Sequence, residues 1–234
     1  MDYSHRQWQE LGLPLSIGQG MGRRIVVKRR DTAAGASAHA EAQRRRHEAG
    51  WLGALRPTPQ STRAWERGAQ GERRVGRRLD KLAPRGVITL HDRRIRGSRA
   101  NLDHIAICAS GVWVIDTKNY RGKVERRDVS TWFGQDLRLF VAGWDRTSLI
   151  DGAVRQARHV TRAIADDTVP VHAVLCFTRS DWSFLAPPFR IQDVMVCWPK
   201  RLARELVRAG DITPSQRKDL AGLLAHRFPD AILA

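Results

Sequence analysis

Cysteine, lysine and long apolar runs are all scarce in this chain. The three cysteines, Cys108, Cys176 and Cys197, each lie in an apolar stretch, and none belongs to a CxxC pair. This spacing predicts buried, reduced thiols and argues against a zinc finger or a disulfide framework. No apolar run approaches the ~18 residues of a membrane span, and the first ten residues lack a signal-peptide pattern. We therefore expect a cytoplasmic protein with no membrane partner.

Acidic residues are also few relative to basic ones. The chain has 24 Asp and Glu against 41 Lys and Arg, a formal net charge of +17, and only six of the basic residues are lysine. Arginine carries a fixed charge and forked donors that suit phosphate, so a nucleic-acid partner is favoured. The alternative is that arginine is abundant on every exposed face for reasons unrelated to binding.

The length and apolar content predict one main domain with an appendage. The 234 residues are 42% hydrophobic, enough for a core of roughly 150–180 residues. Residues 1–60 have few large apolar side chains and about twice as many basic as acidic residues. We expect them to form a basic arm, largely disordered or partly helical at 40–55, that either grips phosphate or is simply a solvated tail. The folded domain is expected at 61–234, with its core at about 65–180.

The apolar pattern from Trp65 onward predicts alternating helices and strands. Helices are expected from Trp65 to just before Pro84, at 149–165, at 199–209, and from the Thr213 N-cap onward. Strands are expected at 86–91, 101–108, 112–118 (closed by Gly122), 169–177 and 191–197, with further short strands within 123–141. This order predicts an α/β fold, a mixed β-sheet flanked by helices.

An apolar, β-branched run at 112–115 ends abruptly in two charged residues, Asp116 and Lys118. If Ser110 and Gly111 form a two-residue turn, Lys118 lies opposite Asp103, and Asp116 is diagonal to it on the same face. A four-residue loop instead puts Asp103 directly opposite Asp116. An unbulged three-residue loop separates them. Two of the three simplest registers therefore bring two carboxylates and an ammonium together.

A third carboxylate, Glu72, occupies the inward stripe of the first helix, where an apolar residue is expected. Two carboxylates ~4 Å apart repel by about 4 kcal/mol at an effective dielectric of ~20, so one lysine cannot balance three of them. A divalent cation can, and oxygen-only ligands favour Mg²⁺ or Mn²⁺. Taken singly, Glu72 could pair with Arg73, and Asp103 with His104.

Residues 68–122 resemble the nuclease-related domain, NERD, a branch of the PD-(D/E)xK nuclease superfamily. The resemblance rests on Gly68-x-x-Gly71-Glu72, Leu102-Asp103-His104 and Gly111-Val-Trp-Val-Ile-Asp116-Thr-Lys118-Asn119. It extends to Gln156 within Arg-Gln-Ala-Arg-His. Two positions depart from the pattern, since Asp116 replaces the commoner glutamate and Leu102 replaces proline.

The resemblance implies a restriction-endonuclease-like core and a catalytic set of Glu72, Asp103, Asp116, Lys118 and Gln156. Asp103 and Asp116 would be metal ligands, with Glu72 a further ligand or a holder of metal-bound water. Lys118 would position the attacking water and stabilise developing charge. Gln156 would hydrogen-bond toward the site, or equally would satisfy a sheet backbone group.

The leading functional hypothesis is a Mg²⁺- or Mn²⁺-dependent nuclease acting on nucleic acid, most simply DNA. The alternative is a basic nucleic-acid-binding module without turnover, and a third hypothesis is a domain for protein contacts, for example in a homodimer. Trp132 and Trp144 could stack on unpaired bases, although core packing is favoured for both. His104 is expected to be packed or exposed rather than a ligand.

Overall fold

The computed structural model describes residue 34 and residues 60–98, 100–131, 134–182 and 187–231. The predicted basic arm, its helix at 40–55 and Trp132 lie outside the described residues, apart from positions 34 and 60. Within the described ranges, no helix is long and apolar enough to cross a membrane.

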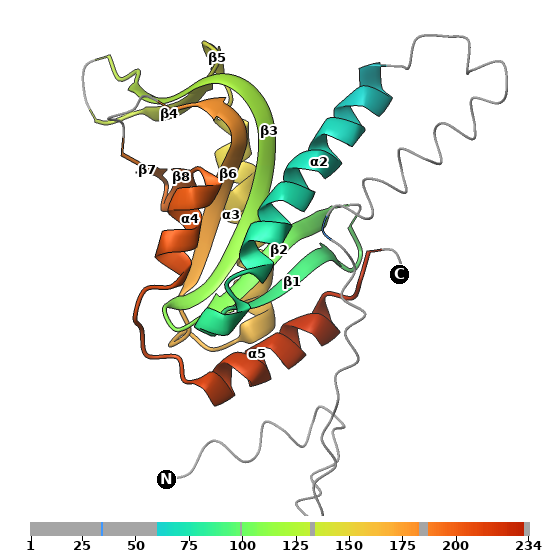
Figure 1. The fold of residues 1–234 in the computed structure, drawn as a ribbon. Helices are drawn as coiled ribbons and strands as arrows, with labels where there is room; N and C mark the ends of the chain where they lie inside the picture. The colour runs from blue at the N-terminus through green and yellow to red at the C-terminus, as the bar shows by residue number, and fades with distance from the viewer. Residues whose placement is uncertain (1–33, 35–59, 99, 132–133, 183–186, 232–234) are drawn as a thin grey trace, which may run out of the picture. The chain divides into compact units, whose positions relative to one another are not determined.

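One mixed β-sheet organises this part of the chain (Figure 1). Its path runs β1-β2-β3-β6-β8-β7, and β4 and β5 extend the sheet from β3. β3 pairs antiparallel with β2 and parallel with β6. The strands are β1 (Ile88–Arg94), β2 (Asn101–Cys108), β3 (Gly111–Asp128), β4 (Leu137–Val141), β5 (Trp144–Asp145), β6 (Val171–Asp181), β7 (Phe189–Ile191) and β8 (Val194–Cys197). The predicted α/β class is confirmed and is consistent with a nuclease-like core.

Two pairs of helices cover the sheet. On one face, Val75 and Leu79 of one helix pack with Trp113 and Ile115 of β3, and a short helix joins the same core. On the other face, Val160 packs with alternate residues of β3. The helices of the first face are α2 (Gln60–Asp80) and α4 (Pro199–Leu206), and those of the second are α3 (Ser148–Ile164) and α5 (Pro214–Arg227). The alternation of β3 side chains between two covered faces explains its continuous apolar run.

The β2–β3 hairpin has the register that brings the two aspartates level. Cys108 pairs with Gly111 and His104 with Ile115, so the turn residues are Ala109 and Ser110, and not Ser110 and Gly111. Gly111 is instead the first strand residue, with φ 137°, and a Cβ there would lie 2.6 Å from the carbonyl oxygen of Pro170. Only glycine fits that close approach.

Strand boundaries differ from the sequence-based expectation, most clearly at two places. β3 does not end at Gly122 but continues to Asp128, because Gly122, at φ 92°, bends the strand against Ala142 of the neighbouring turn. The strand expected at 191–197 is two antiparallel strands, β7 and β8. Gln192 and Asp193, with φ of 48° and 62°, form the turn between them.

Other local expectations are confirmed. Thr213 is the N-cap of α5 and forms a capping box with Gln216, which satisfies two backbone donors at the helix start. All three cysteines are buried and free, and Cys176 lies level with Cys197 on neighbouring strands. They serve as small apolar side chains of the core.

Candidate functional site

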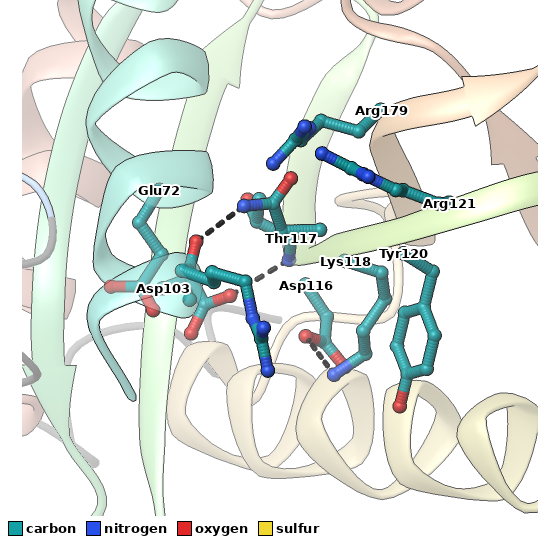
Figure 2. Close-up of a pocket in the computed structure, with 11 residues that line it drawn as sticks. Glu72, Asp103, Asp116, Thr117, Lys118, Tyr120, Arg121 and Arg179 are labelled. Carbon is teal, nitrogen blue, oxygen red and sulfur yellow. Dashed lines mark hydrogen bonds and ion pairs between the residues drawn. The ribbon is translucent and has the colours of Figure 1, made fainter. Parts of the chain in front are cut away.

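A cavity of about 730 Å³ lies beside α2, where β2 and β3 stop pairing. Pairing between the two strands ends at His104 and Ile115, one residue before Asp103 and Asp116. The charged residues that line the cavity are Arg67, Glu72, Asp103, Asp116, Lys118, Arg121 and Arg179 (Figure 2). Four of the five residues predicted for the catalytic set therefore meet in one place.

Glu72 reaches the cavity from the buried face of α2. Ala69 and Val75 on this face are 1% exposed, so the helix is pressed against the sheet at this level. Gly71 allows the approach, since a Cβ there would lie 3.0 Å from the Cβ of Asn119 and 3.3 Å from the hydroxyl of Thr178. The glycine before Glu72 thus sets the distance from the helix to β3 and β6.

Asn119 fastens the same stretch of helix to the sheet. Its side-chain amide donates to the backbone carbonyl of Arg67, and its oxygen accepts from the Thr178 hydroxyl at 3.0 Å. Arg74 of α2 donates to the Thr178 carbonyl at 3.1 Å. These bonds hold α2, β3 and β6 together around Glu72.

Asp103 and Asp116 come from the two strands that separate. Oδ2 of Asp103 accepts a hydrogen bond from the backbone N–H of Thr117 at 2.7 Å. Asp116 is held by an ion pair, with its Oδ1 2.7 Å from Nζ of Lys118. The side chains of this pair are only 7% and 21% exposed, so solvent screens their attraction weakly.

Burial and neighbouring carboxylates raise the pKa of two acidic groups of the cavity, Glu72 and Asp103. Burial, together with the carboxylates of Asp92 and Asp116, raises the pKa of Glu72 to about 7. Burial, together with Glu72 and Asp116, raises the pKa of Asp103 well above its usual value. Burial opposes the charged form of Lys118, but the carboxylates of Asp116 and Asp103 outweigh it and raise the pKa of this lysine. The three carboxylates therefore lie close enough to disfavour one another's charge, and Lys118 offsets only part of that repulsion.

These carboxylates fit a divalent cation by their chemistry but do not form a preassembled ligand cluster. Within the described ranges, no group of three His, Cys, Asp or Glu side chains is arranged to hold a metal ion as it stands. Asp103 is directed to the Thr117 N–H and Asp116 to Lys118, which accounts for the spread of the oxygens. The donors are all oxygen and repel one another, as is typical of Mg²⁺ and Mn²⁺ sites before the ion binds.

Gln156 is not among the residues that line this cavity. It lies on α3, and its buried Oε1 has no hydrogen-bond partner among the residues that the structure describes. The aspartates and lysine are therefore gathered with Glu72, whereas Gln156 remains apart from them.

His104 and Trp144 have clear positions away from the cavity. His104 is fully buried, and its Nδ1 lies 2.9 Å from Nδ1 of His91, whose Nε2 lies 2.9 Å from Asp80. Burial and the neighbouring His91 lower the pKa of His104 well below its usual value, so it packs as a neutral ring, as expected.

Trp144 is 70% exposed at the end of β4–β5, and the expectation that it packs in the core is wrong. A two-residue turn with positive φ at Ala142 and Gly143 carries it out of the sheet.

Sequence reasoning missed three of the lining arginines and the role of Asn119. Arg121 and Arg179 are brought together by long-range pairing of β3 with β6, which no local pattern indicates. The sequence held one signal for the role of Asn119, since this polar residue directly follows Lys118 just after an apolar run.

A comparison with known proteins gives a family match over the part of the chain that contains these residues. The sequence model of the family described as nuclease-related domain, NERD, matches residues 67–178, which confirms the resemblance noted in the sequence. An uncharacterized protein of Bacillus anthracis is 41% identical over 59 residues, a stretch that covers 24% of this chain and 28% of the relative. No solved structure matches the chain significantly. The matched region contains Glu72, Asp103, Asp116 and Lys118.

Proposed function

We propose that this chain, whose residues 67–178 match the nuclease-related domain, is a metal-dependent nuclease that hydrolyses phosphodiester bonds, with DNA as the expected substrate. The observation that carries the proposal is the meeting of Glu72, Asp103, Asp116 and Lys118 in one cavity. A binding surface for nucleic acid has no need of clustered carboxylates, because they repel phosphate.

Asp103 and Asp116 would hold a Mg²⁺ or Mn²⁺ ion, with Glu72 as a further ligand or as the acceptor for a metal-bound water. Such an ion supplies Lewis-acid stabilisation of phosphate oxygens and a more acidic bound water. Burial and the neighbouring carboxylates raise the pKa of Glu72 and Asp103, and a bound cation would favour their ionised forms. Cation binding would compete with the Lys118 ion pair for the carboxylate of Asp116.

Lys118 provides the fixed positive charge of the site. Its raised pKa keeps the ammonium protonated at neutral pH. Its ion pair with Asp116 holds it beside the cavity, ready to face the oxygens on which negative charge develops during hydrolysis. Asn119, the next residue in the chain, is hydrogen-bonded to Thr178 and so holds the backbone of Lys118 in place.

The test is cleavage by the full chain with Mg²⁺, with Mn²⁺ and with a chelator. Single-stranded, duplex and branched DNA and RNA are the substrates, because the site geometry does not select among them. We expect cleavage with metal, loss of cleavage with chelator, and retention of binding by the basic surface. Asp116→Ala should abolish turnover, whereas Asp167→Ala, at an exposed turn, should not. Absence of metal-dependent cleavage of all four substrates would reject the proposal.

The second candidate function is nucleic-acid binding without turnover. It is favoured by one observation, that the described carboxylates do not form a preassembled metal-ligand group. Under this hypothesis, wild type and Asp116→Ala bind nucleic acid equally and neither cleaves it. Metal-dependent cleavage by the wild type would exclude it.

A further inference from the structure

Arg121 and Arg179 lie level with each other on the neighbouring strands β3 and β6. The pairing shifts between Lys118, which pairs with Phe177, and Arg121, which pairs with Arg179, so β3 has one extra residue at this point. Without that bulge, Tyr120 would lie opposite Arg179. Bulges beside functional sites commonly redirect side chains in this way. Figure 2 shows the two guanidinium groups side by side at the wall of the cavity.

An anion between the two guanidinium groups would relieve their mutual repulsion. Like charges directly opposite each other on paired strands destabilise a sheet. Some exposed arginines of the chain are paired locally, as Arg138 is with Asp136 at 2.7 Å and Arg127 with Glu125 at 2.7 Å. For Arg121 and Arg179, the described part of the chain supplies no ion-pair or hydrogen-bond partner to either side chain. An anion that enters the cavity would supply that counter-charge.

We propose that Arg121 and Arg179 form a phosphate subsite that binds the nucleic-acid backbone phosphate next to the scissile one. This proposal rests on the proposed function, because the proposed nuclease site defines which phosphate is the scissile one. Guanidinium groups present paired donors that match phosphate oxygens. The charge of one balances the single negative charge of a phosphodiester, and the second supplies further donors to its oxygens. A backbone phosphate is therefore the ligand that this pair suits best.

The subsite is separate from the carboxylates, although both line one cavity. The principal charges acting on Asp103 are those of Glu72, Asp116 and Lys118. Arg121 and Arg179 come after the bulge, on the β3–β6 pair, whereas Asp103 and Asp116 lie where β2 and β3 separate. One phosphate at the carboxylates and the next at the arginines is thus the arrangement that the cavity allows.

Binding without metal tests the subsite directly. The probe is a fluorescein-labelled DNA 12-mer, single-stranded and as a duplex, titrated in chelator across a range of salt concentrations. Arg121→Gln/Arg179→Gln is compared with Arg158→Gln/Arg162→Gln, which removes the same charge from exposed positions of α3 outside the cavity. We expect the subsite variant to bind the single strand roughly tenfold more weakly. The slope of log affinity against log salt should fall by about 0.7 for each phosphate that the variant no longer binds.

The control variant should keep the wild-type slope. Equal weakening in the two variants would overturn the subsite, because the effect would then come from net charge alone. Arg179→Gln alone serves if the double variant does not fold, with Arg162→Gln as its control. The same comparison of slopes decides the outcome for the single variants.

Cleavage gives a second measurement that separates the subsite from the active site. Bis(p-nitrophenyl) phosphate carries a phosphodiester but no flanking phosphate, so its hydrolysis should be equal in wild type and the subsite variant. On the 12-mer, the variant should show a KM raised about tenfold with kcat little changed, since the arginines bind the flanking phosphate equally in the ground state and the transition state. Equal impairment on both substrates would overturn the assignment to a flanking phosphate. If wild type cleaves neither, the proposed function fails, and the binding comparison in chelator still decides whether the arginines bind phosphate.

Discussion

The carboxylate of Asp103 accepts a hydrogen bond from the backbone N–H of Thr117 at 2.7 Å, beyond the point where β2 and β3 cease to pair. The side chain thus takes the place of a carbonyl of the missing ladder. It satisfies the strand backbone and also brings an oxygen to the cavity wall. The opening between the two strands is therefore stabilised by the residues that occupy it.

Glu72→Gln should stabilise the protein at pH 8 in chelator. The folded-state pKa of about 7 lies above the ordinary 4.5, so ionised Glu72 opposes folding. This penalty is absent below about pH 4.5, grows as the pH rises to about 7, and is constant above that. Each pKa unit corresponds to about 1.4 kcal/mol, and solvent at the open cavity reduces the effect, so we expect a gain of about 1–2 kcal/mol.

Urea unfolding at pH 5 and pH 8 measures the Glu72→Gln effect. Glu125→Gln, on the same sheet, is the control, because its exposed carboxylate has a lowered pKa through hydrogen bonds from Lys123 and Arg127. That control should not become more stable at pH 8. A Glu72→Gln protein less stable than wild type at pH 8 would contradict the prediction. Saturating Mg²⁺ should stabilise the wild type more than Glu72→Gln, because the cation removes the same penalty.

Lys118→Ala should cut the single-turnover cleavage rate by roughly 10²–10³, the usual effect of removing a preorganised charge from a transition state. Metal binding, followed as a Mn²⁺-dependent shift in Tm, should persist because Asp116 is released from its ion pair. Lys123→Ala is the matched control, since this lysine lies on the same strand and pairs with Glu125 at the surface. A Lys118→Ala rate within threefold of wild type is incompatible with a role in catalysis.

Gly71→Ala should lower cleavage and stability together. The added methyl group would press on Asn119 and Thr178 and move α2, with Glu72, away from the sheet. Gly222→Ala in α5 is the control, because no heavy atom lies within 4 Å of the added group. Alanine is favoured over glycine in a helix by about 1 kcal/mol, so that variant should gain stability. Thermal unfolding and cleavage of both variants provide the measurement, and a Gly71→Ala protein with a raised Tm and full activity would refute the packing argument.

Trp144→Ala should weaken binding of single-stranded DNA without affecting stability. The side chain is 70% exposed, so its removal leaves no core cavity, whereas stacking on a base contributes about 1–3 kcal/mol. Binding in chelator should weaken roughly tenfold for the single strand, with Trp144→Phe close to wild type. Unfolding free energy should change by less than about 0.5 kcal/mol. Equal affinity of Trp144→Ala and wild type for the single strand would show that this tryptophan does not stack on bases.

The sequence predicted element types well because periodicity and caps are local. The inward stripe of α2, the apolar run before Asp116 and the Thr213 cap each specify their element without distant contacts. Boundaries were less predictable where tertiary contacts override a local signal. Gly122 looked like a strand end but is a bend within β3, since its positive φ and its approach to Ala142 curve the chain without stopping it.

The site was predictable as far as neighbouring strands and one helix define it. Hairpin geometry was enough to place Asp103, Asp116 and Lys118 together. Glu72 could be identified because it is a charged residue on the otherwise apolar, buried face of its helix. Arg121 and Arg179 are 58 positions apart in the sequence and meet through a bulged parallel pairing, so only the folded sheet places them together. The exposure of Trp144 depends in the same way on a turn whose two residues both have positive φ.

β3 is one uninterrupted strand of 18 residues, and its two halves have different neighbours. Its first half is held between β2 and β6 and carries Asp116 and Lys118, whereas its last residues, from Val124 to Asp128, pair with β4 after pairing with β6 has ended at Lys123. Val124 of this second part, with Leu139 and Val141 of β4, packs in a core shared with α3 and β6. The far end of β3 is therefore anchored by side chains other than those that hold Asp116 and Lys118, so the strand is fixed independently on both sides of the cavity.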